Sequence, residues 1–383
     1  MFRTPGDRIR AYGAGMHQRL DGRRLNRATL ARQHLLGRVD GAERRPLDVV
    51  RDVVGLQGQD PDPPYLMLWN RIEGFTVEQL TALQLDRSVV RATLFRGTLH
   101  LVATDDYLWL RPMLQPMLER WQRGAWGKTL EGVDVDELAK AAADLLDDGR
   151  LTRPRLSRAL AARWPEYSPT ALARSVQGLL PVVHPPPDGL WHRHGPAHVA
   201  LAHTWLGRPL SPGVPPSTLV RRYLAAFGPA TVKDVQAWSG LTRLREVVEA
   251  MRPYLVTFTG EHGEELFDVP DAPRPDPETP APARLLAPLD NVVLAYADRS
   301  RLVGPDAAAR VGWEAAVLID GEVGGFWTMS QDDDAATLTA DLLRSLTGDQ
   351  EAELEAEAAG LLAFAAPEAG RRDVRLRIPA GRA

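Results

Sequence analysis

The sequence predicts an α+β fold in which three tandem units of helices and strands precede a smaller β-rich domain. Two observations lead to this prediction. Helically spaced apolar residues followed by short alternating stretches recur three times between residues 20 and 270, and a proline-rich segment then leads into a region dominated by predicted strands. Residues 1–20 are expected to form an N-terminal arm ahead of the first unit.

The first unit, residues 21–130, departs most from the repeated pattern. Apolar spacing predicts four helices, and these cover residues 25–36, 47–56, 65–72 and 77–85. Residues 98–102 then alternate as a strand, and Thr104 is placed to cap a helix over residues 106–120.

The second unit, residues 131–210, repeats the order of helices followed by a ribbon. Amphipathic helices are predicted over residues 135–146, 154–163 and 170–180. A strand at Val182-Val183, a turn around Asp188-Gly189 and a return over residues 198–202 then form a hairpin.

The third unit, residues 211–270, shows the pattern most clearly. A helix over residues 217–227 is broken by Gly228-Pro229, and Thr231 with Asp234 forms a capping box at the next helix. After Ser239-Gly240, Thr242 is expected to cap a third helix, and two strands follow at residues 254–259 and 266–269. This is the order of a helix-turn-helix with a wing, so we interpret the three units as tandem winged helices.

The remainder of the chain changes character. Residues 271–283 form a stiff proline-rich linker, and residues 284–383 form the C-terminal domain. Its predicted strands cover residues 284–286, 292–296, 315–319, 322–328 and 374–378, and one late helix covers residues 351–364. We expect a small, barrel-like β-rich domain.

Composition excludes several classes of protein. The chain of 383 residues has no cysteine, so disulfides, thiolate catalysis and cysteine-bound metals are excluded. No stretch approaches the roughly 20 apolar residues of a membrane span, so we expect a cytoplasmic protein with no membrane partner. The net charge of −4 argues against a general nucleic-acid binder. Arginines crowd the first fifty residues, which favours phosphate contacts or equally reflects a compositional bias.

The strongest chemical signal is a pair of glutamines around one glycine. Gln57 and Gln59 flank Gly58 at the end of an apolar helical run, and prolines follow at once, so we expect a tight helix-to-helix turn. A glutamine is neither a strong base nor a nucleophile, but its amide orients water and presents a carbonyl dipole to developing positive charge. Such a pair suits a reaction whose leaving group needs little help.

Three segments make the sequence recognisable. They are residues 56–60, Leu-Gln-Gly-Gln-Asp, ahead of residues 65–69, then residues 96–101, Arg-Gly-Thr-Leu-His-Leu, and residues 287–291, Ala-Pro-Leu-Asp-Asn. Together they resemble the winged-helix DNA glycosylases of the AlkZ/YcaQ kind over nearly the whole chain. In that family three winged-helix units and a C-terminal β-domain form a concave DNA-binding face with a glutamine-x-glutamine motif at its centre. Gln57 and Gln59 match that motif, whereas Gly58 stands where the family usually has a larger apolar residue.

The resemblance implies a monofunctional DNA glycosylase of DNA repair. Its partner would be double-stranded DNA containing alkylated guanine, bound in the cytoplasm at the nucleoid, with no cofactor and no obligatory protein partner. Several relatives are self-resistance enzymes of bacteria that make DNA-alkylating natural products, so natural-product adducts and crosslinks are possible substrates. Gln59 is assigned to positioning water and Gln57 to the sugar or lesion, with the order left open. Asp60 is either the carboxylate base or a turn residue.

Further residues are candidates for contact with DNA or lesion. They are Arg96, Thr98, His100, Asp290, Asn291, Arg243 and Arg245. Thr98 and His100 share one face of a predicted strand, so His100 either faces DNA or lesion or is bonded to backbone near the helix that Thr104 caps. Arg96 contacts phosphate or pairs with Asp60 or Asp290. Arg243 and Arg245 lie on the predicted recognition helix, where DNA contact and a scaffold role both stay open.

No metal site is predicted. Four of the five histidines in the second unit lie close together in sequence, at positions 192, 194, 198 and 203, but no carboxylate lies at a suitable spacing.

Two other functions compete with a glycosylase. One is a non-catalytic DNA-binding protein, a regulator or lesion-sequestering factor, that uses the same winged helices. The other is a winged-helix scaffold that binds protein, which the acidic net charge supports.

Overall fold

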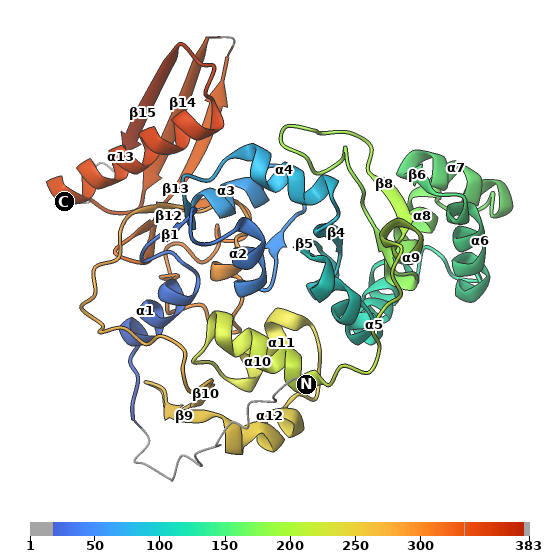
Figure 1. Cartoon of the computed structure of the whole chain (residues 1–383), viewed down its shortest axis with the longest axis horizontal. Coiled ribbons are helices and arrows are strands. Elements are labelled where there is room, and N and C mark those ends of the chain that lie inside the picture. The colour runs from blue at the N-terminus through green and yellow to red at the C-terminus, as the bar shows by residue number, and fades with distance from the viewer. Residues whose placement is uncertain (1–17, 333, 379–383) are drawn as a thin grey trace, which may run out of the picture.

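The computed structural model describes residues 18–332 and 334–378, so most of the expected N-terminal arm lies outside the described residues. Figure 1 shows the second unit at the right of the view, the third unit at the bottom and the C-terminal sheet at the upper left, around the helices of the first unit.

The first unit contains five helices and a small sheet. The helices are α1 (Gly22–Arg32), α2 (Pro46–Asp52), α3 (Pro63–Trp69), α4 (Val77–Leu85) and α5 (Thr104–Trp126). Strands β2 (Leu56–Gln57), β5 (Leu99–Ala103) and β4 (Val89–Thr93) form an antiparallel sheet in that order, and β1 (Val39–Asp40) pairs with β3 (Ile72–Glu73) in parallel.

Two local predictions for this unit are wrong. The helix expected over residues 47–56 ends at Asp52, because Val54 and Gly55 take left-handed φ angles of 58° and 100° and turn the chain into β2. Thr104 begins α5 instead of capping it, since Ala103 is the residue before the helix. Strand β4 was not predicted; all five of its residues are buried, so polar alternation does not mark it.

The second unit has its own hydrophobic core. Helices α6 (Val135–Asp147), α7 (Arg153–Arg163) and α8 (Pro169–Leu179) pack beside a sheet of β6 (Arg150–Thr152), β8 (His198–Leu201) and β7 (Val182–Val183). The short helix α9 (Ala202–Leu206) follows. Leu138, Leu156 and Leu172 are each 0% exposed in this core. The three predicted helices and the returning hairpin are confirmed, and β6 adds a strand that was not predicted.

The third unit follows the predicted order. Helices α10 (Pro216–Phe227), α11 (Val232–Ser239) and α12 (Arg245–Met251) precede the hairpin of β9 (Val256–Thr259) and β10 (Glu265–Asp268). The capping box of Thr231 and Asp234 is present. Thr242 does not cap α12, which begins at Arg245, because Arg243 has a left-handed φ of 63°.

The proline-rich segment runs along α1 and is held there. Its backbone carbonyls accept hydrogen bonds from three arginines of α1: Arg23 to Pro277 at 2.9 Å, Arg27 to Thr279 at 2.7 Å and Arg32 to Pro273 at 3.2 Å.

The C-terminal region is an open sheet with one helix against it. Its strand order is β11 (Arg284–Leu285), β12 (Ala315–Ile319), β13 (Glu322–Gln331), β14 (Ala335–Leu342) and β15 (Arg371–Arg377). Helix α13 (Gly348–Ala365) connects β14 to β15, which pair in parallel. The sheet curls as half of a barrel, with β11 and β15 as its edges.

Two predictions for this region need correction. The strand expected over residues 292–296 is a short 3-10 helix, Asn291–Val293, because the Asp290 carboxylate accepts the amide of Val292 and closes a turn. Strand β14 was missed, although its residues alternate between half-buried and buried.

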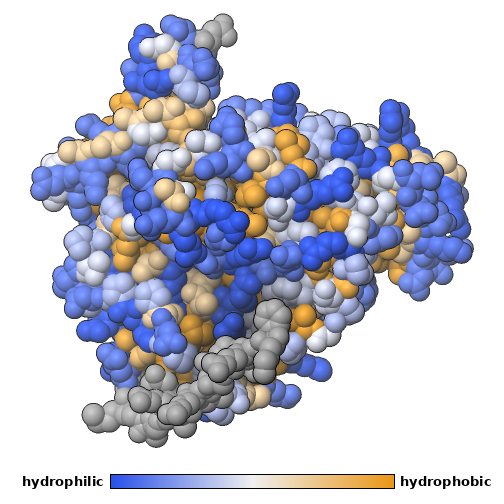
Figure 2. All heavy atoms as spheres, viewed as in Figure 1, coloured by the Kyte–Doolittle hydropathy of each residue, from blue (hydrophilic) through white to orange (hydrophobic). Residues whose placement is uncertain are grey.

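The cores show how the parts are joined. One cluster joins α5 and the third unit to residues 281–326, and another joins α2 and α3 to the C-terminal sheet and α13. None of the described helices is long and apolar enough to cross a membrane. The face in Figure 2 is mostly hydrophilic, with apolar side chains in small scattered areas.

Candidate active site

The glutamine motif lies on the edge of the first unit's sheet and not on a helix-to-helix turn. Gln57 ends β2 and pairs with His100 of β5, and the amide of Gly58 donates to the carbonyl of Leu99 at 2.9 Å. The backbone of the motif is therefore fixed by a strand before α3 begins at Pro63.

The two glutamine side chains have different surroundings. Gln57 is 3% exposed; its Oε1 accepts the amide of Gly58 at 3.0 Å, and its Nε2 donates to Thr98 Oγ1 at 3.4 Å. Gln59 is exposed, and its Oε1 accepts the amide of Leu99 at 3.3 Å. The two side chains therefore differ in role: Gln57 fixes the conformation of the motif by its hydrogen bonds, whereas Gln59 is accessible from solvent.

Arg91 of β4 fixes the backbone of the motif by hydrogen bonds. Its Nε and Nη2 donate to the carbonyl oxygens of Gly58 and Gln59, at 2.5 and 2.9 Å, and its Nη1 lies 2.7 Å from the carboxylate of Asp188 in the second unit. Burial lowers the pKa of Arg91, and Asp188 opposes that shift. The pair thus ties the glutamine motif to the loop between β7 and β8.

Glycine at position 58 allows this close packing. A Cβ atom there would lie 3.3 Å from the amide nitrogen of Leu101 and 3.4 Å from the carbonyl carbon of His100. Both atoms belong to the backbone of β5, so a side chain would press the motif away from the strand.

Several residues that were expected to contact DNA or lesion are buried in the protein. His100 is 0% exposed, with Nδ1 3.1 Å from the carbonyl of Thr98, and burial followed by the charge of Arg96 lowers its pKa to about 3. Asp290 and Asn291 are 1% and 4% exposed. These three side chains are buried in this structure, and their contact with DNA or lesion stays a prediction.

The partners of Asp290 and Arg96 also differ from the alternatives considered. Asp290 accepts two 2.9 Å hydrogen bonds from Arg71, which is equally buried. Half-buried Arg96 donates to the carbonyl of Trp238 at 2.7 Å and to Asn291 Oδ1 at 3.3 Å, so it pairs with neither Asp60 nor Asp290. Burial, and then Arg299, lowers the pKa of Arg96 to about 10.

Gln59, Asp60 and Thr98 line an open cavity of about 1000 Å³ between the first and second units. Its other walls carry residues that sequence reasoning missed, namely Trp121, Trp126, Arg153, Arg158 and Arg174. They come from the end of α5 and from α7 and α8, which are far from the motif in sequence. Helix periodicity placed Arg158 and Arg174 on helices but gave no sign that any of the five residues faces Gln59.

The cavity wall carries an excess of positive charge, because four arginines line it together with two carboxylates, Asp60 and Asp188. Arg153, Arg158 and Arg174 form no salt bridge with any residue that the structure describes, and the Nε of Arg153 is buried without a partner. Burial, and then the neighbouring charge of Arg174, lowers the pKa of Arg153. Such a group of guanidinium ions favours an anion in the cavity.

Arg243 and Arg245 are exposed at the start of α12 and are not among the residues that line this cavity. Any role in binding DNA would therefore be exercised on another part of the surface.

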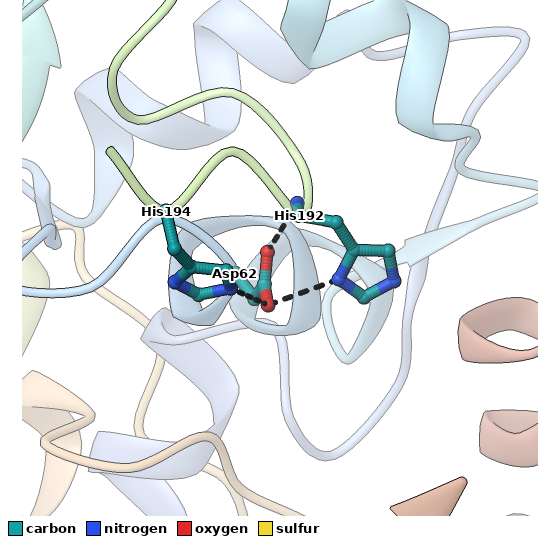
Figure 3. Close-up of side chains that lie close together, drawn as sticks. All are labelled: Asp62, His192 and His194. Atoms are coloured by element: carbon teal, nitrogen blue, oxygen red, sulfur yellow. Dashed lines mark hydrogen bonds and ion pairs between the residues drawn. The ribbon is translucent and has the colours of Figure 1, made fainter. Parts of the chain in front are cut away.

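Two of the four histidines meet a carboxylate. His192 Nδ1 and His194 Nε2 lie 3.2 and 3.4 Å from Asp62 Oδ2 (Figure 3). Sequence spacing gave no sign of this carboxylate, because Asp62 lies just before α3, 130 residues before His192 in sequence. His198 and His203 are not part of this group.

Comparison with known proteins agrees with this architecture. A family model described as DNA glycosylase AlkZ-like matches residues 50–364. The interstrand DNA cross-link repair glycosylase of Streptomyces sahachiroi is 27% identical over 311 residues, covering 73% of this chain and 81% of that protein. The solved structure of Streptomyces sahachiroi DNA glycosylase AlkZ matches with a TM-score of 0.71 and 22% identity, over 94% of this chain and 100% of that one. The structural match shows a shared fold.

Proposed function

This chain belongs to the AlkZ-like DNA glycosylase family, and from that premise we propose that it hydrolyses the N-glycosidic bond of cationic alkylated purines, chiefly 7-alkylguanine, in duplex DNA. The observation that carries the proposal is the position of Gln59, whose exposed side chain lines a cavity rich in unpaired arginines.

The chemistry of the substrate explains why amides suffice. Alkylation at ring nitrogen 7 places a positive charge on guanine, so the base leaves as a neutral molecule and strong acid catalysis is unnecessary. The remaining task is to hold a water beneath the anomeric carbon and to stabilise an oxocarbenium-like transition state. A carbonyl dipole and a nearby carboxylate perform both parts of that task.

We assign these parts to three residues. Gln59 orients the attacking water, because its amide lies at the cavity wall. Asp60, exposed on the same wall, supplies the negative charge that faces the sugar and accepts the proton of the water. Gln57 acts as a positioning residue, since its amide is buried and bonded to Gly58 and Thr98. We therefore do not assign Gln57 to the sugar or lesion.

The three cavity arginines, Arg153, Arg158 and Arg174, form what we call the arginine wall, and this wall supports binding of the DNA backbone. Phosphates are the anions that guanidinium groups prefer, and they would pair with Arg153, Arg158 and Arg174 without displacing an existing carboxylate. We further propose that the three helix-and-strand units are winged helices, which the order of α10 to α12 and the β9–β10 hairpin supports.

The size of the cavity supports bulky lesions as well as methylated bases. An open space of about 1000 Å³ with two tryptophans on its wall offers apolar area for a large adduct. We therefore extend the proposal to natural-product adducts and to interstrand crosslinks, the substrate class in the name of the Streptomyces sahachiroi relative.

The test is release of the base. Purified protein is incubated with duplexes that carry one 7-methylguanine, one bulky 7-alkylguanine or no lesion, and alkali then cleaves the strand at each abasic site. We expect cleavage at the lesion and none in the unmodified duplex. Tight duplex binding without cleavage on either lesion would replace the glycosylase proposal with non-catalytic sequestration of damaged DNA.

A further inference from the structure

Asp62, His192 and His194 form a compact group beside the cavity, and the proposed excision chemistry does not use them. One potential ligand atom from each lies within 4.8 Å of the other two. Figure 3 shows both imidazoles turned toward the carboxylate, with the histidines on the loop after β7 and Asp62 at the start of α3. Two distant segments of the chain therefore place an O,N,N donor set at one point.

Asp62 does not cap α3 with its side chain. It is the residue before the first turn, where aspartate commonly accepts amide hydrogens of the helix, but the first two helical residues, Pro63 and Pro64, have no amide hydrogen to donate. Its Oδ1 instead accepts the backbone amide of His192 at 2.7 Å, and its Oδ2 faces both imidazoles. One oxygen thus holds the loop while the other is directed at the two ring nitrogens.

The loop that carries the histidines is fixed by packing. Trp191 packs against Tyr65 and Phe364, with ring centroids 5.2 and 5.7 Å apart, and its ring lies tilted against that of His192, with centroids 4.4 Å apart. His192 has a left-handed φ of 55°, a backbone conformation that is energetically unfavourable for any residue other than glycine. The surroundings therefore hold this imidazole in place before any ligand arrives.

The distances suit a metal of the zinc class. Ligand atoms at 2.0 to 2.1 Å from a tetrahedral ion are separated from one another by about 3.3 Å. The two nitrogen-to-oxygen distances here are 3.2 and 3.4 Å. Two imidazoles and one carboxylate form a borderline donor set that takes Zn²⁺ and related divalent transition metals in preference to Ca²⁺ or Mg²⁺.

We propose that Asp62, His192 and His194 bind one divalent transition metal ion, Zn²⁺ or a similar cation, with water in the fourth position. The hydrogen bond from the His192 amide to Asp62 Oδ1 orients the carboxylate ligand. The exposed side chains of His192 and His194, at 50% and 62%, leave an open route for the ion.

The bound ion would crosslink two segments of the chain at the rim of the cavity. Asp62 lies three residues after Gln59, and His194 itself lines the cavity. Coordination would therefore join the start of α3 to the loop of the second unit, close to where Arg91 and Asp188 already join the two units. The ion would tighten this junction without taking part in bond cleavage.

The experiment uses untagged, full-length protein stripped of metal with a chelator and returned to pH 7.5, where free histidine is mostly neutral. Zn²⁺ binding is measured by equilibrium dialysis with metal analysis, and Co²⁺ is added as a spectroscopic probe of tetrahedral geometry. The variants are His194→Gln and Asp62→Asn, and His262→Gln is the matched control because His262 is exposed in the β9–β10 turn.

We expect one Zn²⁺ per chain for the parent and the control, an intense visible Co²⁺ spectrum, and affinity at least about tenfold weaker in the two variants. Absence of stoichiometric binding, or equal binding in all four proteins, would overturn the proposal and leave an ion pair between Asp62 and the histidines. If Asp62→Asn fails to fold, His194→Gln decides, because its 62% exposed side chain can be changed without disturbing the core. Base excision is not the readout, so a negative result leaves the proposed glycosylase function untouched.

Discussion

Arg91 and Asp188 form a buried ion pair, with Nη1 2.7 Å from the carboxylate oxygen, and each side chain is 7% exposed. The pair matters because the same guanidinium also donates to the carbonyls of Gly58 and Gln59. The orientation of the proposed catalytic amide is thus coupled to the contact between the first and second units.

Asp188→Asn should slow excision and destabilise the fold. The change leaves a buried guanidinium without its counter-ion, which costs about 3–5 kcal/mol in comparable pairs, and lets Arg91 shift away from the glutamine motif. A misplaced motif would lower single-turnover excision by about 10- to 100-fold. Urea unfolding and excision rate are the measurements, and Asp105→Asn is the control, because its ion pairs are exposed and should be worth less than about 1 kcal/mol. Equal stability and equal excision rates in Asp188→Asn and Asp105→Asn would contradict the proposal that the Arg91–Asp188 pair positions the glutamine motif.

Gln57→Ala and Gln59→Ala should both lose excision but differ in stability. Gln59→Ala removes an exposed group, so we expect a rate loss of about 10²- to 10³-fold with stability changed by less than about 0.5 kcal/mol. Gln57→Ala breaks buried hydrogen bonds and should also cost about 1–2 kcal/mol of unfolding free energy. Exposed Gln331→Ala serves as the control. Unchanged excision in Gln59→Ala would remove it from the site.

Stability should fall as the solution is acidified below pH 6.5. His100 and His184 are buried, and burial lowers the pKa of each from 6.5 to about 3 in the folded protein. The unfolded chain therefore binds protons first, and each histidine removes about 1.4 kcal/mol per pH unit between those two values. Unfolding free energies at pH 7.5, 6.5 and 5.5 measure the slope.

His100→Gln should reduce the dependence of unfolding free energy on pH by the contribution of one histidine, whatever its effect on stability at pH 7.5. Exposed His262→Gln should leave the slope unchanged. A slope in His100→Gln equal to that of the parent would mean that His100 is accessible to protons in the folded state.

Replacing the cavity arginines should weaken DNA binding and its dependence on salt. If Arg153, Arg158 and Arg174 each contact a phosphate, changing one to glutamine should reduce the slope of log affinity against log salt by about one. The measurement is duplex binding between 50 and 200 mM salt. Arg375→Gln on β15 is the control, and Arg243→Gln and Arg245→Gln test the alternative surface at α12. A slope unchanged by all three cavity variants would contradict the arginine wall as the phosphate contact.

Much of the fold follows from local signals. Helices α6, α8, α10 and α13 were predicted because apolar residues recur at helical spacing, and the capping box at Thr231 and Asp234 marked the start of α11. Strands β4 and β6 were missed, because a buried or very short strand has no alternating pattern. Leu56 was predicted to end a helix and Gln57 to lie on a turn, since their pairing with β5 depends on residues more than 40 positions away.

The motif of Gln57 and Gln59, the chemistry available to amides and the resemblance to a DNA glycosylase family were visible in the order of residues, because each depends on residues close together in the chain. The difference between the two glutamines came from folding: pairing with β5 buries Gln57 and leaves Gln59 at the cavity. The arginine wall and the meeting of Asp62 with two histidines likewise depend on how the first and second units pack. Such contacts between distant segments are set by the burial of side chains in three dimensions, and no local spacing encodes them.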